Sequence, residues 1–211
     1  MKMYLDMLFG DWKILFIILF WMYIGFELKF LDQVVDEDRP LNKVVTYAMI
    51  AFTGFVAGFF MVGDSFTGGA GLSLIFGMVL ANKIDNRLWV IQVTAVVYIY
   101  ILFLAYSFSF LPGYTFDWIS IIITFIFVMV FAIMDEVVHD MGDKINNKLL
   151  KKFLDHRPIL DGAIFFMAFV FPFMLWYHAV GFLLFDAMYD LTAYLWKNGN
   201  HGKTEEKEIL E

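Results

Sequence analysis

The sequence predicts an all-α protein, a polytopic transmembrane helical bundle of about seven spans. Of its 211 residues, 61% are hydrophobic and 20% aromatic, and the mean hydropathy is +0.72. Charged residues make up 18% of the chain, fewer than the roughly 25% usual in soluble domains, and they gather between long apolar runs. These runs do not alternate as barrel strands do, and in hydrocarbon a helix satisfies every backbone N–H group within one segment.

The apolar runs give the predicted spans. A helix needs about 20 apolar residues to cross a bilayer core. Such runs cover residues 14–30, 44–62, 66–81, 88–108, 118–134, 162–177 and 179–196. The last two runs follow each other without a polar turn between them. Pro172 lies inside the first of these runs, and Asp186 and Asp190 interrupt the apolar pattern of the second. They are therefore two spans, one long kinked helix, or a span followed by an interfacial helix.

Charge gives the predicted orientation and the domain limits. With seven spans, all but two of the 15 Lys and Arg residues fall on one side, the exceptions being Lys2 and Lys13. Positive charge favours the cytoplasm, so we expect an external N-terminus and a cytoplasmic C-terminus. With six spans the split is less one-sided. Residues 1–196 would form the membrane domain, and residues 197–211 a polar cytoplasmic tail that we expect to be disordered.

Composition also excludes several functions. The chain has no cysteine, which excludes disulfides, zinc–thiolate sites and iron–sulfur clusters. Its net charge of −7 argues against nucleic acid as a partner. The apolar composition instead indicates that the lipid bilayer surrounds the protein.

Two similar segments suggest an internal repeat. LDQVVDED (31–38) follows the first span and MDEVVHDM (134–141) follows the fifth, and each leads through Arg-Pro into the next span. Both copies follow odd-numbered spans, so they belong to one face. This predicts two parallel-oriented halves around a central cavity. The alternative is chance, because helix ends favour polar residues and proline favours helix starts.

The acidic residues of these segments are candidate metal ligands. Asp32 and Asp36 are four apart and share a helix face, which suits a hard divalent ion such as Mg²⁺. The alternative is a solvated acidic loop. In the second segment, acids and a histidine recur one helical turn apart, forming either a metal-binding face or an ordinary charged helix extension: Glu136, His139, Asp140 and Asp143. The basic stretch that follows, from Lys144 to Arg157, could meet a phosphate or anionic lipid headgroups.

Polar residues inside the last predicted span form a separate candidate. These are His178, Asp186 and Asp190, and the two carboxylates share one helix face. An acid within a span is a functional hypothesis by default. The alternative is that the segment lies in the membrane interface, where Asp costs little. The glycine-rich GDSFTGGAG (63–71) lacks the lysine of a phosphate loop and indicates close helix packing instead.

DQVVDEDRPLNK (32–43) resembles the first Asp-rich motif of the UbiA-type membrane prenyltransferases, and DEVVHDMGDK (135–144) is similar to the second. The resemblance covers about residues 14–190. The chain has fewer predicted spans than that family usually has, and His139 stands where the family has an acid.

The resemblance implies an enzyme in which Mg²⁺ binds a prenyl diphosphate, and the prenyl group is transferred to a lipid or aromatic acceptor. By position, Asp32, Asp36 and Asp143 would be the catalytic metal ligands. Arg39 and Lys144 would contact the diphosphate, with Arg157 as a further substrate contact. Metal and basic groups would stabilise charge on the leaving diphosphate.

Two other functions are predicted by different features. The intramembrane residues His178, Asp186 and Asp190 favour a cation transporter or channel. The 26 Phe and 13 Met residues would suit a non-catalytic membrane subunit that packs against other helices.

Overall fold

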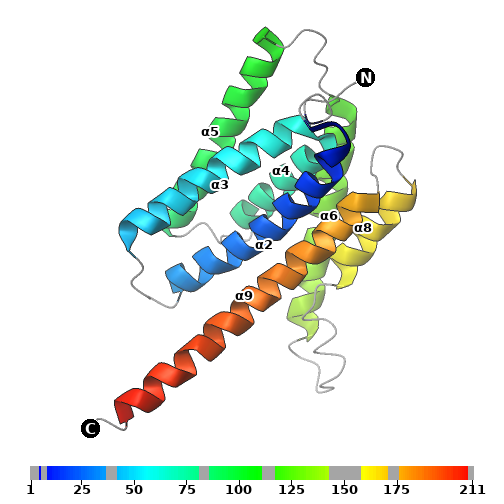
Figure 1. Ribbon diagram of the computed structural model, residues 1–211. Helices are drawn as coiled ribbons and strands as arrows, with labels where there is room; N and C mark the ends of the chain where they lie inside the picture. Colours follow the sequence, from blue (N-terminus) through cyan, green and yellow to red (C-terminus); the bar gives the residue numbers. More distant parts are fainter. Residues whose placement is uncertain are drawn as a thin grey trace.

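The computed structural model describes residue 5 and residues 9–36, 42–80, 86–110, 117–142, 158–170 and 176–208. Nearly all of these described residues are helical and none is in a β-strand, which confirms the all-α prediction. A short 3₁₀ helix, η1 (Gly10–Trp12), precedes seven α-helices (Figure 1): α2 (Lys13–Asp36), α3 (Lys43–Gly63), α4 (Ser65–Leu80), α5 (Arg87–Phe110), α6 (Trp118–Gly142), α8 (Pro158–Val170) and α9 (Trp176–Glu208).

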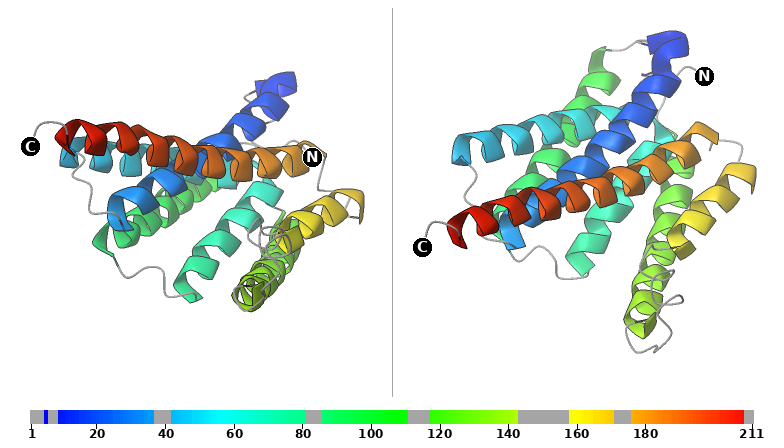
Figure 2. Two further views of the ribbon diagram at one scale, coloured as in Figure 1. Left: turned by 90° about the horizontal axis from the view of Figure 1, so that it is seen from below. Right: turned by 60° about the horizontal axis from the view of Figure 1, so that its bottom comes forward.

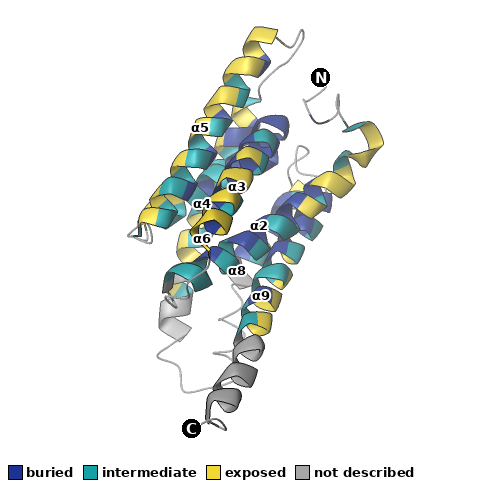
Figure 3. Ribbon diagram, turned by 60° about the vertical axis from the view of Figure 1, so that its left-hand side comes forward, coloured by how far each residue is buried: buried dark blue, intermediate teal, exposed yellow. Residues whose placement is uncertain are grey.

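Three of these helical segments are long and apolar enough to cross a membrane, judged by length and composition: Gly10–Val35, Lys43–Gly63 and Arg87–Phe110. Three shorter helices are also apolar. Exposed residues lie along the outer faces of the helices (Figure 3), and many of them are large and apolar, such as Phe169, which is 89% exposed, and Ile119, which is 72% exposed. Monomeric soluble proteins rarely expose extended apolar surface, so this surface supports contact with lipid.

The helices pack mainly in three pairs. α2 lies along α9, α3 along α5, and α4 along α6 (Figures 1 and 2). Further contacts of α3 with α4, α2 with α3, α6 with α8 and α8 with α9 join the pairs. Trp21 lies at the centre of the aromatic core, where its ring is 5.2 Å from that of Phe182 on α9 and 6.5 Å from that of Phe66 on α4.

Glycines let each helix pair approach closely. A Cβ atom on Gly25 of α2 would collide with the backbone carbonyl of Phe185 on α9. On Gly58 of α3 it would lie 2.7 Å from the backbone nitrogen of Tyr100 on α5. On Gly69 of α4 it would lie 2.7 Å from the backbone oxygen of Ile121 on α6. Small residues at crossing points are the usual means of helix association in a bilayer.

The ends of several helices differ from the prediction. The acidic segments after the first and fifth runs are helical as far as the structure describes them: residues 31–36 end α2 and residues 134–142 end α6, so the alternative of a loop does not hold for these residues. The sixth span, predicted over 162–177, is wrong at both ends, because α8 covers Pro158–Val170 and α9 already begins at Trp176. One long kinked helix is also wrong, because α8 and α9 pack against each other. Pro172 lies outside the described residues.

Residues 197–211 were expected to be disordered, but most of this segment is helical. Helix α9 continues to Glu208. The segment includes good helix formers, namely Glu205, Glu206 and Lys207. Once a helix is nucleated, each further residue that is ordered adds one backbone hydrogen bond, so extension is easier than initiation.

Candidate functional site

The two acidic segments lie at corresponding helix ends. α2 and α6 run in the same general direction and end on the side of the bundle where α9 also ends (Figure 1). Asp32 is partly buried and its carboxylate pairs with Lys29, three residues earlier. For Asp36, Glu136, His139 and Asp140 the structure describes the helical backbone but not the side chains, and Arg39, Asp143, Lys144 and Arg157 lie outside the described residues.

The described residues therefore do not assemble the predicted metal site. Within the described ranges, no three side chains of His, Cys, Asp or Glu lie close enough together to hold a metal ion. The prediction of Mg²⁺ at Asp32 and Asp36 thus stays a prediction, as does their meeting with the second acidic segment.

The intramembrane set predicted on the last span is spread over three environments. His178 is buried, with 1% of its surface exposed. Asp186 is half-buried and is in hydrogen-bonding contact with Asp161 of α8. Asp190 is exposed. The three side chains do not form one site, and His178 instead belongs to a cluster that the sequence had not indicated.

Lys13, Asp64 and His178 form this first buried cluster, which we call the Asp64 cluster. Asp64 Oδ1 lies 3.7 Å from Lys13 Nζ, and Asp64 Oδ2 lies 3.5 Å from His178 Nε2. The side chains of Asp64 and His178 are 5% and 1% exposed. His178 Nδ1 is buried and has no hydrogen-bond partner among the described residues. The cluster thus joins a carboxylate, an ammonium group and an imidazole from three segments of the chain.

Local sequence places Asp64 at this point. It follows the last residue of α3 in extended backbone conformation, and its carboxylate accepts hydrogen bonds from the backbone N–H and the hydroxyl of Thr67, both at 2.9 Å. An Asp whose carboxylate accepts a hydrogen bond from the backbone N–H three residues later is a favoured helix N-cap. The cap of α4 therefore holds the carboxylate where α2 and α9 begin.

Glu27 is the centre of a second buried cluster, the Glu27 cluster. Its side chain lies within α2 and only 1% of the residue is exposed. Gln92 Nε2 of α5 donates to Glu27 Oε2 at 3.1 Å, and the hydroxyl of Thr53 on α3 also hydrogen-bonds Glu27. Tyr23 Oη lies 2.6 Å from Thr53 Oγ1. Because the single hydroxyl proton of Thr53 points to the carboxylate, Tyr23 donates to Thr53.

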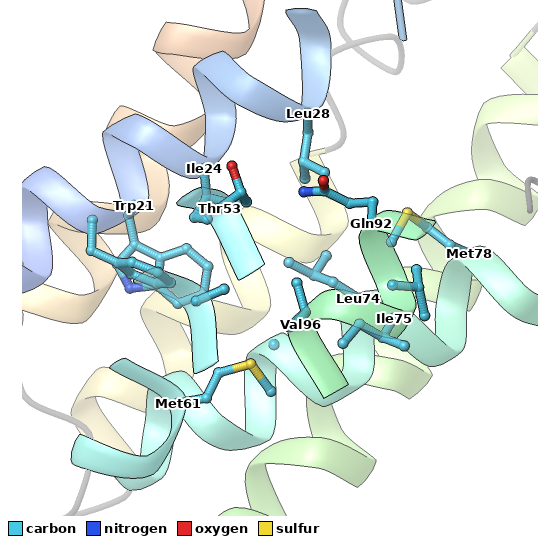
Figure 4. Close-up of a pocket in the computed structure, with 14 residues that line it drawn as sticks. Trp21, Ile24, Leu28, Thr53, Met61, Leu74, Ile75, Met78, Gln92 and Val96 are labelled. Atoms are coloured by element: carbon cyan, nitrogen blue, oxygen red, sulfur yellow. The ribbon is translucent and has the colours of Figure 1, made fainter. Parts of the chain in front are cut away.

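A pocket of about 60 Å³ lies among α2, α3, α4 and α5 (Figure 4), and Thr53 and Gln92 of the Glu27 cluster belong to its lining. Gln92 and Leu28 mark one end and Met61 the other, with Trp21 on one side and Met78 on the opposite side. Its lining is otherwise aliphatic or aromatic apart from Thr53. The pocket thus belongs to the first four long helices and does not lie between two halves of the chain.

The positions of the charged groups along α2 match the thickness of a bilayer. At 1.5 Å per residue, Glu27 lies about 21 Å and Asp32 about 28 Å along the helix from Lys13. The hydrocarbon core of a bilayer is about 30 Å thick. Ionisable groups therefore occur where α2 begins, at Lys13, and near its end, at Asp32, and Glu27 lies about three-quarters of the way between these two.

The sequence contained signals for both missed clusters. Ile17, Phe20, Ile24, Glu27 and Leu31 recur at intervals of three and four, which places Glu27 on the buried face of α2. Asp64 with Thr67 has the spacing of an N-cap with its partner. The partners Gln92 and Lys13 carry no comparable signal, because only the packing of α2 against other helices brings them close.

Comparison of the chain with family models, with curated proteins and with solved structures found no match in any of the three.

Proposed function

We propose that this protein is a multi-pass membrane protein that moves a cation, in the first place a proton, through its helical bundle. Its N-terminus would be external and its C-terminus cytoplasmic. The observation that carries the proposal is a pair of buried carboxylates along α2: Glu27, which belongs to the helix, and Asp64, which contacts Lys13 at its start. A charged side chain at the centre of a bilayer costs about 2.5–3.5 kcal/mol on insertion scales.

Each carboxylate is surrounded by groups that can pass or balance a proton. Asp64 has an ammonium group at 3.7 Å and an imidazole at 3.5 Å. Glu27 is reached by the hydroxyl chain from Tyr23 through Thr53. Imidazole, hydroxyl and carboxyl groups are the usual members of proton relays in membranes. The apolar pocket beside Thr53 and Gln92 would keep the Glu27 cluster dry until water or a cation enters it.

Ion flux tests the proposal directly. The purified protein is reconstituted into liposomes that contain a pH-sensitive dye, and a potassium gradient with valinomycin sets the membrane potential. We expect internal pH to change faster than in protein-free liposomes. Sodium and potassium fluxes, measured with the corresponding dyes, identify the cation. If proton, sodium and potassium fluxes all equal those of protein-free liposomes, the proposal is wrong.

Prenyl transfer is a second proposal, favoured by a different observation. The acidic ends of α2 and α6 lie on the same side of the bundle (Figure 1), as two Mg²⁺-binding motifs would have to. The experiment is an assay of Mg²⁺-dependent diphosphate release from a prenyl diphosphate. We expect Asp32→Ala and Asp143→Ala to abolish release. Absence of turnover in the wild type, or activity unchanged in both variants, would exclude this function.

A further inference from the structure

We propose that His178 is the proton-binding group of the Asp64 cluster, and that it binds its proton in competition with Lys13 for the one carboxylate of Asp64. The inference deepens the proposed function, on which its place in transport rests. The cluster lies where three segments meet: the start of α2, the residue before α4 and the first turn of α9. Each of the three side chains has a separate part in the uptake of a proton.

The contact with Asp64 decides which nitrogen of His178 carries hydrogen. Nε2 lies 3.5 Å from Asp64 Oδ2. A carboxylate only accepts hydrogen bonds, so in the neutral ring Nε2 carries the hydrogen. Nδ1 is then the basic nitrogen, and it is buried without a hydrogen-bond partner among the described residues. A proton binds there and needs no permanent channel, because local opening lets buried groups near a helix end exchange with water.

The charge of the cluster changes when that proton binds. In the neutral state of His178, Asp64 balances the ammonium group of Lys13, whose Nζ lies 3.7 Å from Oδ1. Once His178 is an imidazolium, two cations each contact one oxygen of a single carboxylate. Thr67 also donates to this carboxylate, but its N–H and hydroxyl groups are neutral. An uncompensated charge inside a protein is unfavourable, so the two cations compete for Asp64.

Neighbouring elements bring no second carboxylate to His178 within the described ranges. Helix α4 contains no charged residue. On α8, Asp161 contacts Asp186, which lies two turns further along α9. On η1, Asp11 is exposed. The charged groups that act on the imidazole are Lys13 and Asp64.

Packing decides which of the two cations leaves. The side chain of His178 is 1% exposed, and its ring centre lies 4.7 Å from that of Phe66 and 4.4 Å from that of Tyr177. Lys13 is the first residue of α2, and its side chain is 12% exposed. A lysine can lay its flexible stem along apolar surface and keep its ammonium group in water. Proton uptake by His178 should therefore release Lys13 toward solvent, and Asp64 then balances the imidazolium.

Histidine NMR on the full-length protein in detergent measures this competition without measuring flux. The four histidines are labelled with nitrogen-15, and the ring signals that His178→Gln lacks are those of His178. The signals are followed from about pH 4 to about pH 9. We expect Lys13→Met and Lys13→Gln to raise the titration midpoint of His178 by at least about one pH unit. This is a tenfold gain in proton affinity, and it follows from the loss of the competing cation.

Two further lysine variants are the matched controls. Lys13→Arg keeps a cation beside Asp64, and Lys29→Met removes a lysine that pairs with Asp32 near the other end of α2. We expect His178 to titrate in both as it does in the wild type.

Equal midpoints in the wild type, Lys13→Met and Lys13→Gln would overturn the proposal, as would a His178 that stays neutral over the whole range in both of these variants. A neutral ring with its hydrogen on Nδ1 would also overturn it, because the bare Nε2 would then face Asp64. The expected shift without any cation flux would instead remove the proposed function and leave His178 as the proton-binding group of the cluster.

Discussion

Gln92 Nε2 donates to Glu27 Oε2 at 3.1 Å across 65 positions of sequence, and this hydrogen bond joins α5 to the buried face of α2. The two residues are 3% and 1% exposed. Neither side chain could be placed there alone without leaving a polar group unpaired in an apolar bundle. The contact therefore ties the packing of the helices to the buried carboxylate on which the proposed function rests.

The Glu27–Gln92 contact predicts a non-additive effect on stability. Glu27→Leu and Gln92→Leu should each lower the free energy of unfolding by about 1–3 kcal/mol, because each leaves a buried polar partner. The double variant should lose less than the sum of the two. Unfolding of all four proteins in one detergent gives the coupling energy. Strictly additive losses would show that the two side chains do not interact.

The close approach of α3 and α5 at Gly58 predicts a second stability effect. A Cβ at this position would be 2.7 Å from the backbone nitrogen of Tyr100, so a backbone must move. We expect Gly58→Ala to cost about 1–3 kcal/mol and to lower the Tm. The control is Gly77→Ala on α4, where a Cβ meets nothing within 4 Å. Equal Tm values for the two variants would contradict the packing of α3 on α5.

Asp64 and Asp117 each cap a helix, so the difference between the stability losses of their alanine variants measures what the Asp64 cluster adds beyond capping. Asp64 caps α4 through Thr67, and Asp117 caps α6 through the backbone N–H and hydroxyl of Ser120. Asp117→Ala should cost about 0.5–2 kcal/mol, the usual value of a cap. Asp64→Ala should cost more, because it also removes the ion-pair contact with Lys13 and the contact with His178 inside the bundle.

The measurement is thermal unfolding of the two cap variants beside the wild type. A loss in Asp64→Ala no greater than in Asp117→Ala would mean that Asp64 acts only as a helix cap. It would then add nothing through its contacts with Lys13 and His178.

The helices could be predicted from the sequence because their signal is local. The first, second, fourth and fifth apolar runs each lie within one helix, and residues 66–80 of the third lie within α4. A Cβ at Gly68 or Gly69 would collide with neighbouring atoms, as expected for close helix packing. Gly77, outside the glycine-rich segment 63–71, faces open space, because a Cβ there would meet nothing within 4 Å. The limits of α8 and α9 were missed because both helices are interrupted by polar residues, so hydropathy alone does not mark their ends.

The buried clusters were harder to predict, for a physical reason. Glu27 lies near the end of the first predicted span, 14–30, whereas α2 continues as a helix to Asp36 and keeps Glu27 inside the bundle. Asp64 looked like part of a glycine-rich turn. What makes either residue a candidate site is its partner on another helix, and the pairing of α2 with α9 and of α3 with α5 arises only on folding.

Flux in variants of the two buried carboxylates tests the central claim most directly. Glu27→Gln and Asp64→Asn keep the shape of each side chain and remove its charge. The matched controls are Asp190→Asn, an exposed carboxylate on α9, and Asp117→Asn, the other aspartate cap. With equal amounts of folded protein in liposomes, we expect Glu27→Gln and Asp64→Asn to reduce cation flux at least about tenfold, which corresponds to roughly 1.4 kcal/mol in the barrier, while both controls keep wild-type flux. Wild-type flux in Glu27→Gln and Asp64→Asn would contradict the account.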